Sequence, residues 1–221
     1  YQGSIDTIAA NISKAIRTLG IPRENLFLTD KVWNTDRGYD QVQEALRRSL
    51  KKLKTDYIDL YLIHWPASKK LYPDDWKDIN AQTWKGMEKL LSDGLVRAIG
   101  VCNFKVEHLE ELSKTCEILP FVDQIECHPG MISSEIRDDC SDNGIIVEAS
   151  SPLGNGKILN NETILAISER YGKTSAQICL MWCRSKGIIP IPKTTSANRL
   201  KENMDIFDKE LIEQDVKLID E

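Results

Sequence analysis

Residues 56–66, with the sequence DYIDLYLIHWP, decide the fold. Five of the six residues before His64 are apolar, which is typical of a parallel strand buried on both faces. Five further segments of this kind occur along the chain, at residues 26–28 leading into 31–33, 96–101, 121–125, 145–147 and 188–191. The pattern therefore predicts six parallel strands.

Amphipathic segments lie between these predicted strands. One stripe of apolar residues at helical spacing runs from Val42 to Leu53, and others occur near Leu109 and between residues 164 and 181. Regular alternation of strands and helices predicts a parallel α/β fold. Since no linker or low-complexity segment interrupts the chain, we expect a single domain over residues 1–221.

The chain opens with a predicted helix rather than a strand. Apolar residues recur at helical spacing from Ile5 to Leu19, and Gly20 ends the pattern. Six strands leave a closed eight-stranded barrel two strands short, whereas an open doubly wound sheet tolerates six. Periodicity alone leaves both architectures open.

Composition and charge exclude several classes of protein. The 221 residues are 41% hydrophobic and 29% charged, with a net charge of -5, which disfavours nucleic-acid and anionic-membrane partners. No apolar run reaches the roughly 18 residues of a membrane span. Three histidines without ligand spacing predict no metal site. Six scattered cysteines without a CxxC pair indicate reduced thiols and a cytoplasmic protein.

Polar residues stand at or just after the carboxyl ends of the predicted strands, where parallel β/α folds bind ligands. They are Lys31, His64, Asn103, Gln124, Ser151 and Lys193. Taken singly, Lys31 is also explained as a lysine that reaches solvent, and His64 as a core histidine bonded to the backbone.

A second pattern follows the last predicted strand. Lys193 and Thr194 precede a predicted helix start that carries Arg199. Free N–H groups at a helix start, together with two cations, form a phosphate site in physical terms. The alternative is a capped surface helix with a solvated charged face.

Six motifs together resemble a known family. In chain order they are KVW at 31–33, DYIDLYLIHWP at 56–66, IGVCNF at 99–104, QIECHP at 124–129, SPLG at 151–154 and IPK at 191–193. They are similar to successive signatures of the aldo-keto reductases, in particular the prostaglandin F synthase and 2,5-diketo-D-gluconate reductase branches. The resemblance implies a (β/α)8 TIM barrel, of which this chain carries the third to eighth strands and lacks the first two.

The resemblance also implies catalytic residues. The family uses an Asp, Tyr, Lys and His set, and here Lys31 matches the lysine and His64 the histidine. Tyr1 stands in the region of the tyrosine, and the aspartate is expected before residue 1. Asp6 is not assigned to that role, because it falls in the first turn of a predicted helix.

The implied cofactor is NADPH, bound without a Rossmann motif. Asn103 and Gln124 match residues that hold the nicotinamide carboxamide, and Trp33 and Trp65 match walls of the substrate pocket. Cys102 and Ser150 depart from the usual serine and stacking tyrosine. The remaining cofactor positions are Ser151 and Leu153 at the pyrophosphate, Lys193, Thr194 and Arg199 at the 2′-phosphate, and Glu202 and Asn203 near the adenine.

The function implied is hydride transfer from NADPH to an aldehyde or ketone, giving an alcohol. We expect a monomer whose partner is a small carbonyl compound. One alternative is a catalytically weak or inactive NADPH-binding subunit of the same fold. Another is an unrelated phosphate-handling barrel enzyme, because fold alone does not assign function.

Overall fold

The computed structural model describes the backbone of residues 2–221 and the side chains of residues 9–221. The chain divides into two compact units, Tyr1–Val122 and Asp123–Glu221. Tyr1, the expected catalytic tyrosine, lies outside the described residues. The single domain expected over residues 1–221 stays a prediction.

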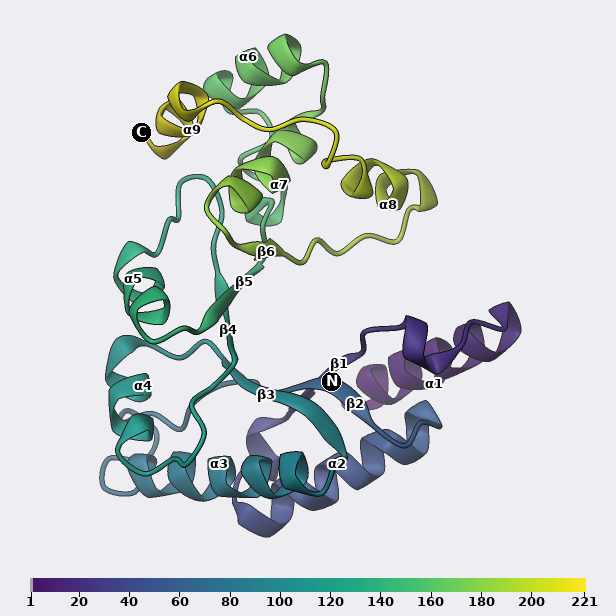
Figure 1. Cartoon of the computed structure of the whole chain (residues 1–221), viewed down its shortest axis with the longest axis vertical. Coiled ribbons are helices and arrows are strands. Elements are labelled where there is room, and N and C mark those ends of the chain that lie inside the picture. The colour runs from purple at the N-terminus through teal and green to yellow at the C-terminus, as the bar shows by residue number, and fades with distance from the viewer. Residues whose placement is uncertain (1) are drawn as a thin grey trace. The chain divides into compact units, whose positions relative to one another are not determined.

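The first unit alternates strands and helices. Strands β1, β2 and β3 lie side by side in that order and run parallel. Helices α2 and α3 lie together on one side of these strands (Figure 1). The elements are α1 (Gln2–Leu19), β1 (Thr29–Val32), α2 (Tyr39–Leu53), β2 (Ile58–Ile63), α3 (Trp76–Ser92), β3 (Val96–Cys102) and α4 (Val106–Ser113).

The register of these strands brings distant side chains to one face. Lys31 pairs with Leu62, and Leu62 pairs with Gly100. Because side chains alternate along a strand, Leu62 and Cys102 share a face, and they pack with Leu60 and Val122 in a buried cluster. This apolar cluster supports the polar residues at the strand ends.

Two glycines permit close packing in the first unit. A Cβ on Gly100 would lie 2.5 Å from the Val122 carbonyl oxygen and 2.8 Å from Leu62 Cδ2. A Cβ on Gly86 of α3 would lie 2.7 Å from the Tyr39 carbonyl oxygen of α2. The absence of a side chain therefore lets α2 and α3 approach closely.

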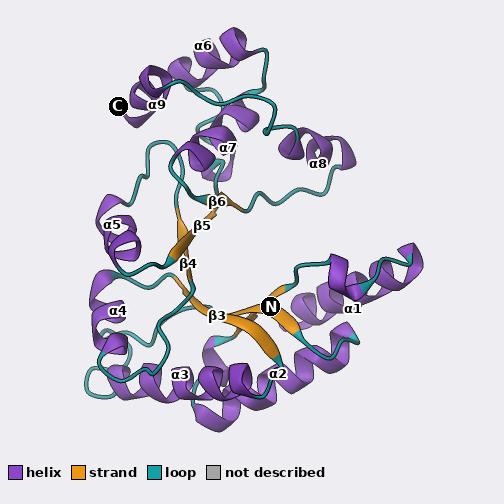
Figure 2. Ribbon diagram, in the orientation of Figure 1, coloured by secondary structure: helices purple, strands orange, loops and turns teal. Residues whose placement is uncertain are grey.

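The strands and helices of the second unit are on the whole shorter than those of the first (Figure 2). Strands β4, β5 and β6 are neighbours in that order, and β5 and β6 are parallel. Helix α7 is buried from Gln177 to Cys183, and its Trp182 donates to Asp220 of α9 at 2.8 Å. The elements are β4 (Val122–Glu126), α5 (Ser134–Asp142), β5 (Ile146–Ser150), α6 (Glu162–Tyr171), α7 (Ser175–Ser185), β6 (Ile189–Pro190), α8 (Ala197–Met204) and α9 (Glu213–Asp220).

All six predicted strands are present, so the parallel α/β prediction is confirmed. Several boundaries differ by one to three residues, and the clearest differences are that β1 begins at Thr29, after the apolar residues 26–28, and that β6 is only two residues long. None of the helices within residues 2–221 combines the length and apolar character that a membrane crossing requires.

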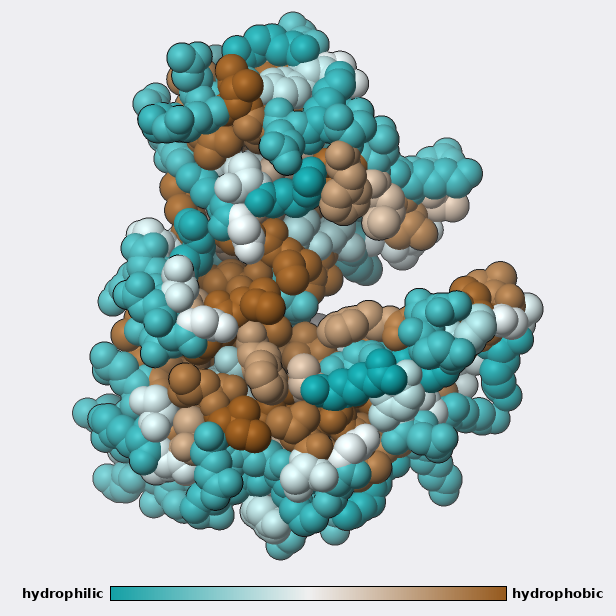
Figure 3. All heavy atoms as spheres, in the orientation of Figure 1, coloured by the Kyte–Doolittle hydropathy of each residue, from teal (hydrophilic) through white to brown (hydrophobic). Residues whose placement is uncertain are grey.

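The first helix forms, but its apolar stripe is only partly covered. Ile12 and Leu19 of α1 are 40% and 69% exposed, whereas Ser13 is buried. Apolar atoms are visible at the surface where α1 ends (Figure 3). The spacing predicted the helix correctly, but it could not tell whether a neighbour would cover the stripe.

Candidate functional site

Lys31 and His64 lie at the carboxyl ends of adjacent strands. Lys31 is opposite Leu62, two residues before His64, and the His64 backbone N–H donates to the Val32 carbonyl at 3.2 Å. Both side chains are half-buried. The pairing of β1 with β2 therefore places the two expected catalytic residues of this unit at one end of the sheet.

The environment of His64 favours the neutral imidazole. Burial, and then the positive charge of Lys31, lower the pKa of His64 from 6.5 to about 4. A neutral imidazole carries one ring N–H and can donate one hydrogen bond. At neutral pH His64 can thus orient a polar group without bringing a charge into the site.

Two tryptophans lie close to this imidazole. The Trp33 ring meets that of His64 edge-on at a centroid distance of 5.0 Å, and the Trp65 ring is stacked with it at a centroid distance of 6.5 Å. Trp65 is 48% exposed, and its carbonyl accepts from Arg37 at 3.0 Å. The three rings lie together and are partly open to solvent, and the expected role of Trp33 and Trp65 as walls of the substrate pocket stays a prediction.

Asn103 and Cys102 join the same group. The Asn103 amide nitrogen donates to the His64 carbonyl at 3.0 Å and to Cys102 Sγ at 3.2 Å. The ammonium of Lys31 donates to the same sulfur at 3.5 Å. Asn103 is thereby held at the end of β3, next to β2, the strand that His64 follows.

The backbone is strained directly after two of the strands. Asn103 follows β3 with φ 61°, and Ser151 follows β5 with φ 50°. Residues other than glycine adopt this region rarely, and such strain is concentrated at functional sites. Both positions were singled out in the sequence as cofactor-binding candidates.

In the second unit, Gln124 is paired with a buried acid. Its amide nitrogen donates to Glu148 Oε2 at 2.8 Å, and both side chains are buried. Glu148 was not singled out in the sequence. The signal was present, because a glutamate interrupts the apolar run 145–149, where an unpaired charge would be costly.

The turn after β5 holds Ser151 and Leu153. The Ser151 carbonyl accepts from the Gly154 N–H at 2.8 Å, which closes a tight turn. Both side chains are half-buried.

Arg37, whose guanidinium donates to the Trp65 carbonyl, is a second residue near the site that was not singled out in the sequence. No local sequence pattern marks it.

The segment after β6 has the features of an anion site. The hydroxyl oxygen of Thr194 accepts from the Ser196 N–H, and the Ser196 hydroxyl caps α8 by accepting from the Arg199 N–H. Lys193 and Arg199 are exposed, and neither forms an ion pair with any described residue. Two cations thus flank a capped helix start.

The remaining two candidates have structural partners. The Glu202 carboxylate accepts from the Thr174 hydroxyl at 2.7 Å, which links α8 to the start of α7. Asn203 is buried beside Leu200 and Met204 in an apolar groove of about 490 Å³. Their expected location near an adenine stays a prediction.

Each unit brings together part of the expected set. The first unit groups Lys31, His64, Asn103 and the two tryptophans, and the second groups Lys193, Thr194 and Arg199, with Gln124 inside β4 and Ser151 directly after β5. Within the described residues, no group of three or more His, Cys, Asp or Glu side chains is arranged to hold a metal ion.

Comparison with known proteins gives consistent matches. The profile described as "Aldo/keto reductase family" matches residues 9–221. A glyoxal reductase of Bacillus subtilis is 46% identical over an alignment of 222 positions, which covers 98% of this chain and 77% of the relative. A 9,11-endoperoxide prostaglandin H2 reductase of Trypanosoma cruzi is 42% identical over an alignment of 213 positions, which covers 95% of this chain and 72% of that protein.

Solved structures agree with these sequence matches. An aldo/keto reductase from Brucella melitensis superposes with a TM-score of 0.89 at 43% identity, covering 96% of this chain and 79% of that one. A Bombyx mori aldo-keto reductase in complex with NADP gives 0.86 at 37% identity, covering 97% and 73%. These neighbours are (β/α)8 barrels, so the fold class expected from the sequence is confirmed.

Proposed function

Because the chain belongs to the aldo-keto reductase family, an oxidoreductase family, we propose that it reduces an aldehyde or ketone to the alcohol with NADPH. The observation that carries this proposal is the pairing of Lys31 with a neutral His64 at one strand end, beside Trp33. Carbonyl reduction needs a proton donor, whose acidity a nearby cation can raise, and it is assisted by a neutral hydrogen-bond donor to the carbonyl oxygen.

Lys31 has the proposed task of tuning a proton donor. A tyrosine with a pKa of about 10 is a poor acid at neutral pH. A nearby ammonium stabilises the phenolate and lowers that pKa. We assign the donor role to Tyr1, which the sequence resemblance supports, with Lys31 acting on it.

His64 has the proposed task of orienting the substrate. Its single ring N–H donates to the carbonyl oxygen, and this bond strengthens as negative charge develops there. Since the pKa of His64 is about 4, the imidazole remains a neutral donor throughout the physiological range. Trp33 and Trp65 then exclude water from one side of the carbonyl.

The residues present fit NADPH, which supplies the hydride when bound. Lys193, Thr194 and Arg199 suit the 2′-phosphate, since Arg199 is exposed near the start of a capped helix and engages no acid among the described side chains. Asn103 and Gln124 suit the carboxamide. The remaining assignments are Ser151 and Leu153 at the pyrophosphate, and Glu202 and Asn203 near the adenine.

The similarity to a glyoxal reductase supports small aldehydes, dicarbonyls included, as the first substrates to test. The purified gene product should oxidise NADPH in the presence of glyoxal or a simple aldehyde. The reaction is measured as the loss of absorbance of the reduced nucleotide. NADPH binding without any turnover would favour the inactive subunit instead. Absence of NADPH binding would overturn both proposals.

The cofactor preference has its own test in Arg199→Ala. Loss of the guanidinium should weaken NADPH binding about 10–100-fold, because a charge-assisted contact to the 2′-phosphate disappears. NADH lacks that phosphate, so its binding should change little. Lys201→Ala in the same helix is the control, and nucleotide titration is the measurement. An equal loss for both nucleotides would contradict the assignment.

A monomeric state, a small carbonyl compound as the partner and a cytoplasmic location remain predictions from the sequence. The six cysteines support the location, because none is disulfide-bonded.

A further inference from the structure

Cys102 lies at the centre of the contacts that join the expected catalytic residues of the first unit. Its sulfur accepts from Lys31 Nζ at 3.5 Å and from Asn103 Nδ2 at 3.2 Å. The same Asn103 amide donates its other hydrogen to the His64 carbonyl at 3.0 Å. One thiol therefore connects the strand that carries Lys31 to the strand that carries His64.

The fold holds this thiol firmly. Cys102 is the last residue of β3 and is only 2% exposed. It packs with Leu60, Leu62 and Val122 in a buried apolar cluster. The sulfur is consequently a fixed point, whereas the Lys31 side chain has four rotatable bonds to restrict.

We propose that Cys102 is a positioning residue, which holds the Lys31 ammonium in the place from which it acts on the proton donor. This inference rests on the proposed function of Lys31. The thiol is a weak acceptor, but a sulfur in van der Waals and hydrogen-bond contact limits the positions open to the ammonium. Asn103 fixes the sulfur from the other side and ties it to the His64 backbone.

A different role for Cys102 makes a different prediction. A serine at this position would be expected to contact the nicotinamide carboxamide, and Cys102 could serve the cofactor in the same manner. Loss of the side chain would then weaken NADPH binding. A positioning role predicts instead that kcat and its pH dependence change while NADPH affinity stays.

The test compares Cys102→Ala, Cys102→Val and Cys102→Ser in the complete gene product. Alanine removes the acceptor, and valine removes it while filling the apolar cluster, so one of the two should fold if the other does not. Serine restores an acceptor. Cys116→Ala is the matched control, because this half-buried thiol follows α4 and takes no part in the site.

We expect kcat to fall about 10–100-fold in the alanine and valine variants, since small misplacements of a catalytic group cost this much. The apparent pKa on the alkaline limb of kcat should rise, because a displaced ammonium stabilises the phenolate less. The serine variant should recover most of both properties. The Kd for NADPH should stay within about twofold.

Three outcomes would overturn the inference. A raised Kd for NADPH with an unchanged pH profile would make Cys102 a cofactor contact. Unchanged kcat and pH profile in both apolar variants, with Lys31→Met inactive, would remove the positioning role alone. Full turnover by Lys31→Met would show instead that the proposed role of Lys31 is wrong.

Discussion

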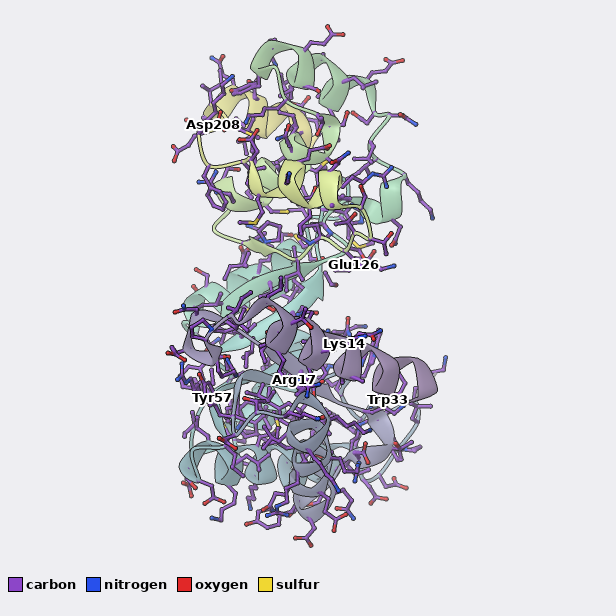
Figure 4. All side chains as sticks on the ribbon, turned by 90° about the vertical axis from the view of Figure 1, so that its right-hand side faces the viewer. Lys14, Arg17, Trp33, Tyr57, Glu126 and Asp208 are labelled. Atoms are coloured by element: carbon purple, nitrogen blue, oxygen red, sulfur yellow. The ribbon has the colours of Figure 1, made fainter. Side chains whose placement is uncertain are left out.

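The two ends of the parallel strands in the first unit differ in how their polar side chains are bonded to one another. Tyr57 and Trp33 mark these ends and lie on opposite sides of the unit (Figure 4). At the amino end, the Tyr57 ring lies between the guanidinium groups of Arg23 and Arg97, at 3.9 and 4.1 Å from its centroid. At the carboxyl end, Trp33 stands beside a half-buried imidazole.

The amino end is saturated with hydrogen bonds. Arg23 donates to Asp59 at 2.7 Å, to the Tyr57 carbonyl at 2.9 Å and to the Leu26 carbonyl at 2.9 Å. The buried Asp59 also accepts from the Leu28 N–H at 2.9 Å. A group with so many mutual contacts stabilises the fold and has little capacity left for a ligand.

The carboxyl end is arranged differently. It contains a residue with positive φ at Asn103, a histidine whose pKa is lowered to about 4, and an exposed Trp65. Strain and perturbed ionisation reduce stability and are tolerated where they serve chemistry. We therefore expect the same three strands to serve stability at one end and chemistry at the other, as parallel β/α barrels generally do.

The largest expected effect at the carboxyl end comes from Lys31→Met. Turnover should fall by about a thousandfold or more, because the proton donor loses the charge that lowers its pKa. The melting temperature and the Kd for NADPH should change little. Steady-state kinetics, thermal unfolding and nucleotide titration on one sample measure all three quantities. Lys51→Met, on the exposed surface of α2, is the control.

The contrary pattern for Lys31→Met would be a lowered melting temperature with turnover intact. It would assign Lys31 to stability and remove the difference between the two strand ends.

At the amino end, Asp59→Ala should give the opposite result. Removing this carboxylate leaves Arg23 and the Leu28 N–H without their buried acceptor, so the free energy of unfolding should fall by about 3 kcal/mol. The kcat measured well below the melting temperature should stay within about twofold of the unaltered protein. Denaturant unfolding and kinetics provide the two measurements.

Asp93→Ala is the control for this stability effect. Asp93 pairs with Lys89 at the solvent-exposed end of α3, and such a surface pair contributes at most about 1 kcal/mol. If Asp59→Ala lowered kcat strongly in fully folded protein, the strand ends would not be functionally separate.

The smallest expected effect concerns the ionisation of His64. Its folded pKa of about 4 lies below the unfolded value of 6.5, so between these values the unfolded chain binds more protons. The ionisation of His64 therefore costs no stability above pH 6.5, and it lowers the free energy of unfolding progressively as the pH falls toward 4. His64→Gln should flatten that part of the stability curve.

The Lys31→Met variant provides a second test of the pKa of His64. Removing the ammonium should raise the pKa of His64 only part of the way back toward 6.5, because burial is the larger cause of its depression. With only three histidines in the chain, proton NMR can follow each imidazole separately. A His64 that titrates near 6.5 in the unaltered protein would contradict the neutral-donor role.

Some features of this protein follow from local sequence. The apolar run 58–63 forms a buried strand because nearly every residue favours one, and His64 must then follow its carboxyl end. The stripe from Val42 to Leu53 forms α2 for a similar reason. The motifs and their order identify the family, because each motif lies within a few consecutive residues.

Other features depend on contacts between residues that are far apart in the chain, and only the tertiary structure decided them. Lys31 meets Cys102 across 71 positions, and Gln124 meets Glu148 across 24. The pKa of His64 depends on its burial and on the distance to Lys31, neither of which a local pattern encodes. Helical spacing likewise predicted α1 but not the exposure of Leu19, because burial is a property of the neighbours rather than of the helix.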